Sequence, residues 1–126
     1  MDRTAYINTV ENYFSSLDGR NLDEGLAYFD RDAVFTVQSA FITCSGHAAI
    51  RAMFEQFLQT YRTALHTDFE HIVDTDGEAI ASRFRVELDH EDGSHETKRS
   101  TNQWYFKDGL FQRVYVLIIG ANVLGE

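Results

Sequence analysis

The densest group of residues that could bind a metal ion or move a proton runs from Asp89 to Glu96. It holds His90, His95 and several carboxylates. Imidazole and carboxylate groups are common ligands of zinc. The run also contains Asp92-Gly93, which is typical of a hairpin turn, and charged side chains at a hairpin tip are normally solvated. We therefore expect a surface charge cluster here and assign no metal ion to it.

The segment Cys44-Ser45-Gly46-His47 places a thiol near an imidazole. A cysteine nucleophile needs a base within hydrogen-bond reach and a third group that orients this base. Adjacent positions in a sequence do not supply that geometry, and no third group can be identified. Ser45 is better explained as the N-cap of a helix, because a serine oxygen accepts from the N–H groups of the first turn.

The elements that must position any site are indicated by three Asp-Gly pairs. Asp76-Gly77, Asp92-Gly93 and Asp108-Gly109 follow one another at a constant spacing of 16 residues. Asp-Gly between apolar runs is a strong hairpin signal, because a type I′ turn needs positive φ at both central residues. The spacing predicts a four-strand antiparallel meander from Ala64 to Ile119.

Two helices are predicted at the start of the chain. Residues 4–17 carry apolar side chains at spacings of three and four, the pattern of a helix with one buried face. Asn21 with Glu24 three residues later is typical of a helix N-terminus, and a short helix is expected through Phe29. Asp30-Arg31-Asp32 should close it.

Residues 33–44 are rich in β-branched and aromatic side chains and lack helical spacing. They predict one bent strand or a short hairpin that breaks near Ser39. A third helix should follow Ser45, with a wide apolar stripe from Ile50 to Tyr61 facing the sheet. The whole pattern predicts an α+β domain, whose long strands curl into a cone with the helices on its concave face.

Composition limits the possible partners. The 126 residues suit one domain, so we expect a single domain over residues 1–126. The net charge of −9 argues against nucleic acid and anionic membrane surfaces. Cys44 is the single cysteine, which excludes an internal disulfide, and residues 1–3 lead into no apolar signal segment. We expect a cytoplasmic protein that does not span a membrane.

Four short motifs carry a family resemblance: Val10-Glu11-Asn12-Tyr13, residues 17–22 (LDGRNL), residues 32–35 (DAVF) and residues 46–51 (GHAAIR). With the order of the elements, they make the chain similar to the nuclear transport factor 2-like superfamily, closest to its SnoaL-like and ketosteroid isomerase-like group. The resemblance implies a pocket between the helices and the concave face of the sheet, and a homodimer. It leaves function open, because the family includes isomerases, cyclases, dehydratases, binding modules and adaptors.

Some functional positions of the family are kept and others are not. Tyr13 falls where ketosteroid isomerases keep an oxyanion-hole tyrosine, and Asn102 falls at their second donor, a protonated aspartate. Their general-base aspartate falls near Val37, and the acid/base aspartate of SnoaL-type cyclases falls near Tyr115. Because valine cannot take a proton, the standard steroid isomerase mechanism is not expected.

Asp18 and His66 match the aspartate and histidine of a branch that includes scytalone dehydratase. An aspartate that accepts from one imidazole nitrogen leaves the other nitrogen to move a substrate proton. The alternative is that Asp18 caps a helix and His66 is a half-exposed strand residue. Strand alternation from Leu65 places His66 on the face opposite Phe69 and Val73, with Asp68 and Glu70, unless a bulge near Thr67 changes the register.

The resemblance also suggests the pocket wall. Asn102 and Trp104 should face the cone, Asn102 as a donor to substrate oxygen and Trp104 as a surface for a flat ring. The alternative is a structural asparagine and a core tryptophan. Other side chains expected to face an apolar substrate are Phe14, Phe54, Phe57, Tyr115, Leu117 and Ile119.

Together these observations favour a small-molecule pocket protein. The leading hypothesis is an isomerase, cyclase or dehydratase that needs no cofactor and acts on an apolar ring substrate. In it Asp18 orients His66, which moves the proton, while Tyr13 and Asn102 hold the developing oxyanion. The alternatives are a carrier or sensor without chemistry, which the missing aspartates at Val37 and Tyr115 would fit, and a dimeric protein-docking module.

Overall fold

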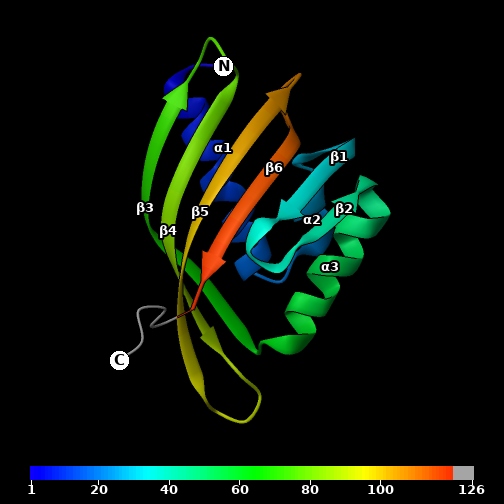
Figure 1. Ribbon diagram of the computed structural model, residues 1–126, viewed down its shortest axis with the longest axis vertical. Coiled ribbons are helices and arrows are strands. Elements are labelled where there is room, and N and C mark those ends of the chain that lie inside the picture. The colour runs from blue at the N-terminus through cyan, green and yellow to red at the C-terminus, as the bar shows by residue number, and fades with distance from the viewer. Residues whose placement is uncertain (121–126) are drawn as a thin grey trace.

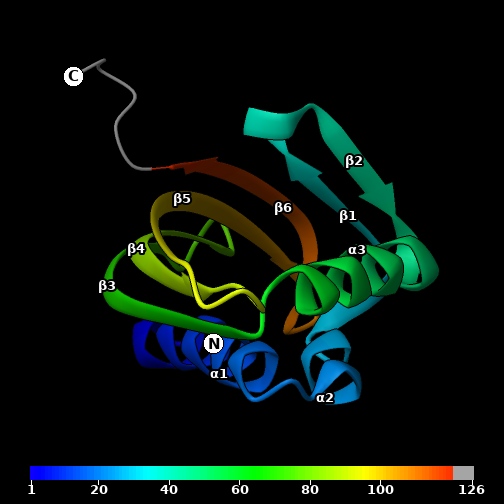
Figure 2. The same cartoon turned by 90° about the horizontal axis from the view of Figure 1, so that it is seen from below.

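The computed structural model describes residues 1–120 and confirms the α+β class. Three helices lie on the side toward which one strongly curved sheet curls (Figure 1, Figure 2). The six strands have the order β2-β1-β6-β5-β4-β3, so the cone stays open between its edge strands β2 and β3. In chain order the elements are α1 (Arg3–Asp18), α2 (Leu22–Leu26), β1 (Phe29–Val37), the 3-10 turn η1 (Gln38–Ala40), β2 (Ile42–Ser45), α3 (Gly46–Thr60), β3 (Thr63–Asp74), β4 (Ala79–Asp89), β5 (His95–Lys107) and β6 (Leu110–Ile119).

Strands β3 to β6 form the predicted antiparallel meander. At its last turn, Asp108 and Gly109 both have positive φ, 51° and 79°, as a type I′ turn requires. The other two turns differ, because positive φ falls on Gly93 in one and on Glu78, after the Asp-Gly pair, in the other. The Asp-Gly spacing therefore located all three turns but described the geometry of the last one alone.

The segment between α1 and α3 departs from expectation in part. The short helix α2 ends at Leu26, and Phe29 already begins β1, so the prediction of helix through Phe29 was wrong. Phe29 pairs with Phe111 of β6 and is buried, and this tertiary contact outweighs its helical spacing from Leu22 and Leu26. The hairpin of β1 and β2 turns at η1, which confirms the break near Ser39. Because β1 runs parallel to β6, the sheet is mixed.

The helices are held at their ends and along one face. The Asp2 side chain caps α1 by accepting from the N–H of Ala5 at 2.8 Å. The buried face of α1 packs mainly against β3, and α3 packs against β1. Ser45 stands at the N-cap of α3 as predicted, but its side chain makes no capping hydrogen bond. No helix in residues 1–120 has the length and apolar character that crossing a bilayer requires.

An aromatic cluster joins α1 to the sheet. The ring of Tyr13 lies 5.5 Å from Trp104 and 5.6 Å from Phe111, and Trp104 and Phe111 are 4.5 Å apart, all between ring centroids. These three residues are among the most deeply buried in the molecule. Such contacts between rings add about 0.5–1.5 kcal/mol per pair to the gain from burial. The cluster therefore fixes the position of α1, the helix that also supplies part of the pocket.

The turn geometry predicts opposite effects for two glycine substitutions. Gly109→Ala should lower the free energy of unfolding by about 1–2 kcal/mol, because φ at this residue is 79° and a Cβ is strained there. Gly25→Ala should be neutral or stabilising by up to about 1 kcal/mol, because it lies in α2 and no heavy atom would meet the added Cβ within 4 Å. Urea denaturation measures both, and equal effects would contradict the turn assignment.

Candidate active site

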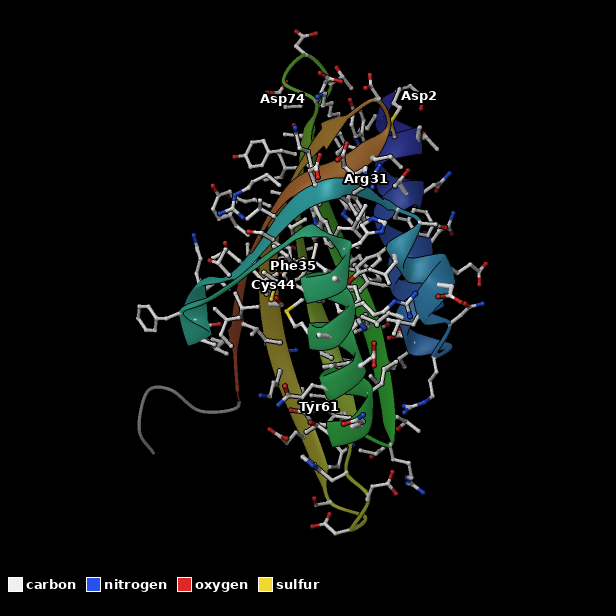
Figure 3. The ribbon with its side chains drawn as sticks, turned by 90° about the vertical axis from the view of Figure 1, so that its right-hand side faces the viewer. Asp2, Arg31, Phe35, Cys44, Tyr61 and Asp74 are labelled. Atoms are coloured by element: carbon white, nitrogen blue, oxygen red, sulfur yellow. The ribbon has the colours of Figure 1, made fainter. Side chains whose placement is uncertain are left out.

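A mainly apolar pocket of about 240 Å³ lies between the helices and the concave face of the sheet. Its aromatic wall includes Phe14 of α1 and Phe54 and Phe57 of α3. In Figure 3, Phe35 and Tyr61, which also line the pocket, lie near opposite ends of α3. The size suits a small ligand of one or two rings, and pockets of this kind bind ligands through apolar contact and a few placed polar groups.

Asp18 and His66 meet at the wall of this pocket. Oδ1 of Asp18, the last residue of α1, is 2.6 Å from Nδ1 of His66 on β3, and Oδ2 accepts from the His66 backbone N–H at 2.8 Å. The side chains are 14% and 7% exposed. His66 lines the pocket and stacks on Phe14 with 4.3 Å between ring centroids. Within residues 1–120 no group bonds to Nε2, so the ring has one occupied and one available nitrogen.

A bulge in β3 explains why His66 faces the pocket. Between Thr67 and Glu70 the register of β3 against β4 shifts by one residue, and Asp68 takes a left-handed φ of 58°. His66 and Phe69 therefore share the concave face, and the simple alternation that separated them fails. Asp68 is turned to the outer face, where it pairs with Arg85 at 2.7 Å.

Tyr13 and Asn102 supply two polar groups in the same pocket. Burial raises the pKa of the Tyr13 hydroxyl well above its usual value, and the nearby Asp18 charge adds to the shift, so Tyr13 remains a neutral donor. Oδ1 of the buried Asn102 accepts from the Ser100 hydroxyl at 2.7 Å, which orients the amide. The structure thus brings together all four residues expected to be catalytic, Tyr13, Asp18, His66 and Asn102, although Asp18 stands behind His66.

The prediction of which side chains of the last strand face the pocket was wrong. Tyr115, Leu117 and Ile119 lie on the outer face, where Leu117 and Ile119 are 50% and 43% exposed. The reason is a second bulge, since β6 has one residue more than β5 between the pairs Tyr105–Arg113 and Phe106–Phe111. Val116 and Ile118 line the pocket instead.

Trp104 is a core residue and not part of the pocket lining. It is completely buried among Tyr13, Phe14 and Phe111. It therefore supports Tyr13 from behind and offers no surface to a ligand in this structure. Phe14, Phe54 and Phe57 do line the pocket, and their contact with a substrate stays a prediction.

Several residues that line the pocket were not among the expected site residues. Val37 lines the pocket and gives no acid or base there, and Lys98 lies on β5 in the same inward alternation as Ser100 and Asn102. That alternation was the signal that could have identified Lys98. Met53 of α3, which lies within the predicted apolar stripe, and Leu88 of β4 add to the apolar wall.

A second histidine–carboxylate pair lies outside the pocket. Nε2 of His71 is 2.7 Å from Oε2 of Glu11, and Nδ1 is 2.9 Å from the hydroxyl of the buried Ser82. Glu11 precedes Asp18 by two helical turns on α1. Because both nitrogens of His71 have partners, this pair fastens α1 to the sheet and leaves no nitrogen for a substrate.

The charged run at the tip of the β4–β5 hairpin forms surface ion pairs. His95 contacts Glu87 at 2.5 Å and Asp89 at 2.7 Å, and His90 contacts Glu96 at 2.5 Å. The hydrogen bonds to Asp89 and Glu87 raise the pKa of His95. Hydrogen bonds from Thr97 and then His95 lower the pKa of Glu87, and those from Thr63 and then His95 lower the pKa of Asp89. Among residues 1–120, no group of three or more His, Cys, Asp or Glu side chains is placed to hold a metal ion.

The fold and this pocket define a class of protein. Solved structures that share this fold include one described as an NTF2-like protein and one described as having a ketosteroid isomerase-like fold. A family model described as the SnoaL-like domain matches residues 10–114. The chain belongs to the SnoaL-like domain family.

Several solved structures share the fold at low sequence identity. A candidate polyketide cyclase from Xanthomonas campestris pv. campestris has a TM-score of 0.81 and 17% identity, over 91% of this chain and 90% of that chain. A candidate isomerase from Bacillus subtilis has a TM-score of 0.82 and 13% identity, over 94% and 90%. A protein with a ketosteroid isomerase-like fold from Catenulispora acidiphila, in complex with trimethylamine, has a TM-score of 0.77 and 9% identity, over 86% of this chain and 82% of that chain. In a comparison with curated proteins, none matches this sequence.

The raised pKa of Tyr13 predicts that its hydroxyl stays protonated in the folded protein at pH values where an ordinary tyrosine ionises. Between about pH 9 and about pH 11, where an ordinary tyrosine ionises, folded wild type and Tyr13→Phe should give equal ultraviolet difference signals. In denaturant the wild type should give the larger signal, because Tyr13 then ionises. The same shift affects stability. The folded protein should become less stable as the pH rises above about 10, because Tyr13 then releases its proton only in the unfolded state. A smaller signal for folded Tyr13→Phe would contradict the assignment.

Proposed function

We propose that this protein is an acid/base enzyme that needs no cofactor and isomerises, cyclises or dehydrates a small ring compound bearing a carbonyl group. The observation that carries the proposal is the Asp18–His66 pair, in which Nδ1 is held at 2.6 Å and Nε2 is available in an apolar pocket. This is the geometry of a general base whose ring is oriented by a second group.

In the proposed reaction Nε2 of His66 removes a proton from the carbon next to the substrate carbonyl. The electrons of the C–H bond form a carbon–carbon double bond, and the carbonyl electrons move onto oxygen to give an enolate. The Tyr13 hydroxyl and the Asn102 amide donate to that oxygen. The protonated His66 then returns the proton to another carbon in an isomerisation, or to a leaving hydroxyl group in a dehydration, which restores the neutral imidazole.

The surroundings support each step of this scheme. Asp18 stabilises the imidazolium that forms, and the stacking on Phe14 keeps the ring in place. The apolar wall excludes water, which strengthens the hydrogen bonds to the oxyanion. Positioned acid/base groups of this kind contribute about 10²–10⁴-fold to a rate.

Family membership supports the class of chemistry. Two structural neighbours carry the names polyketide cyclase and isomerase. The resemblance places the base of ketosteroid isomerases near Val37, a pocket residue that cannot take a proton, so we assign the proton-transfer role to His66. The same absence favours the second candidate function, a carrier or sensor that binds the ring compound and leaves it unchanged.

Deuterium exchange tests the proposal without knowledge of the natural substrate. The probe is 2-tetralone, a two-ring ketone, and NMR in deuterium oxide follows the loss of its α-protons. The wild type should accelerate exchange over buffer, and His66→Ala should reduce this acceleration about 100-fold or more. Asp18→Asn should also slow exchange strongly, because an amide favours the wrong imidazole tautomer.

The matched control is His95→Ala, the same substitution at the exposed hairpin tip, which should leave exchange unchanged. Circular dichroism should show that all variants remain folded. Full activity of His66→Ala would remove His66 from the mechanism. Tight binding of 2-tetralone without exchange would favour the carrier.

A further inference from the structure

Lys98 is a basic side chain in an otherwise uncharged stretch of the pocket wall. It lines the pocket from β5, pairs across the sheet with Val86, and its side chain is 27% exposed. Within residues 1–120, the pocket lining includes no other lysine or arginine and no carboxylate. A charged group that lines a mainly apolar pocket is stabilised when an anion accompanies it.

One carboxylate, that of Glu96, partly offsets this charge, and Lys98 is among the groups that lower the pKa of Glu96, after the hydrogen bond from His90. The single acidic partner within residues 1–120 is Glu96, whose Oε1 is 3.8 Å from Nζ, at the outer limit of an ion pair. Oε2 of Glu96 is already bonded to Nε2 of His90 at 2.5 Å. The Lys98 ammonium therefore retains hydrogen-bonding capacity toward the pocket.

We infer that Lys98 is the recognition group for a carboxylate on the substrate, so that the protein acts on ring-containing organic acids. This inference rests on the proposed function for the identity of the pocket. The ring system lies against Phe14, Phe54 and Phe57, its carboxylate bonds to Lys98, and its reacting oxygen points to Tyr13 and Asn102. In a chain with a net charge of −9, the lysine also offsets the repulsion that an anionic ligand meets.

The spacing along β5 sets the length of such a ligand. Lys98 and Asn102 point to the same face and are four residues apart, which separates their Cα atoms by about 13 Å. The side chains of both residues shorten the gap that a ligand must bridge. A fused two-ring acid matches this span and the pocket volume of about 240 Å³.

The test compares two ligands that have the same shape and differ in charge. Calorimetry measures the Kd of 2-naphthoate and of its neutral amide, 2-naphthamide, with the wild type, Lys98→Met and Lys98→Arg. The wild type should bind the carboxylate about tenfold more tightly or better, as expected of a charge-assisted hydrogen bond. Lys98→Met should abolish this preference and keep its affinity for the amide, and Lys98→Arg should retain the preference.

The matched control is Lys107→Met, which removes the same charge from an exposed position on the same strand and outside the pocket. It should leave the preference intact. Equal binding of the two compounds to the wild type, a preference that survives in Lys98→Met, or failure of both compounds to bind would each overturn the inference.

This result is separable from the proposed chemistry. The carboxylate preference should persist in His66→Ala, because Lys98 and not the imidazole holds the anion. If the protein prefers the carboxylate but does not exchange protons of 2-tetralone, the Lys98 inference stands and the proposed function is overturned. If the protein exchanges protons of 2-tetralone but binds both naphthalene compounds equally, the proposed function stands and the Lys98 inference is overturned.

Discussion

The pocket depends on one carboxylate that joins two distant parts of the chain. Asp18 ends α1 and accepts from both the backbone N–H and the ring of His66, 48 residues later on β3. The double contact positions the end of the helix against the strand and orients the imidazole at the same time. A single residue therefore couples the packing of α1 to the availability of Nε2, the atom on which the proposed chemistry depends.

Two bulges decide which residues share the pocket with that imidazole. The bulge in β3 brings Phe69 to the face of His66, and the bulge in β6 turns Val116 and Ile118 inward and Leu117 outward. Each bulge changes the alternation for the rest of its strand. Two local irregularities in an otherwise regular meander thus decide which side chains of β3 and β6 face inward.

The sequence allowed the fold to be predicted because its signals are local. The Asp-Gly pairs mark the turns, and the apolar stripes of α1 and α3 mark the helices. The faces of β3 and β6 were not predictable in the same way, since alternation assumes an unbroken register. The pair Glu11–His71 was also beyond prediction, because it requires the register between α1 and β3, which no local pattern encodes.

The four residues expected to be catalytic were predicted from the family resemblance and not from local sequence signals. Tyr13 and Asp18 share α1, but His66 and Asn102 are distant from them in the chain, and the family resemblance alone linked the four. Phe29 shows the opposite case: its helical spacing was clear, and a strand contact with Phe111 overrode it. Local pattern is reliable here where no long-range contact competes with it.

The position of the proton on His66 tests the central claim most directly. Long-range proton–nitrogen NMR at about pH 8 distinguishes the two neutral imidazole tautomers. We expect the proton on Nδ1 and a bare Nε2 in the wild type, and the opposite tautomer in Asp18→Asn. His47 is an internal reference, because its Nε2 lies 2.8 Å from the carbonyl oxygen of Phe29 and must carry the proton. A proton on Nε2 of His66 in the wild type would contradict the account.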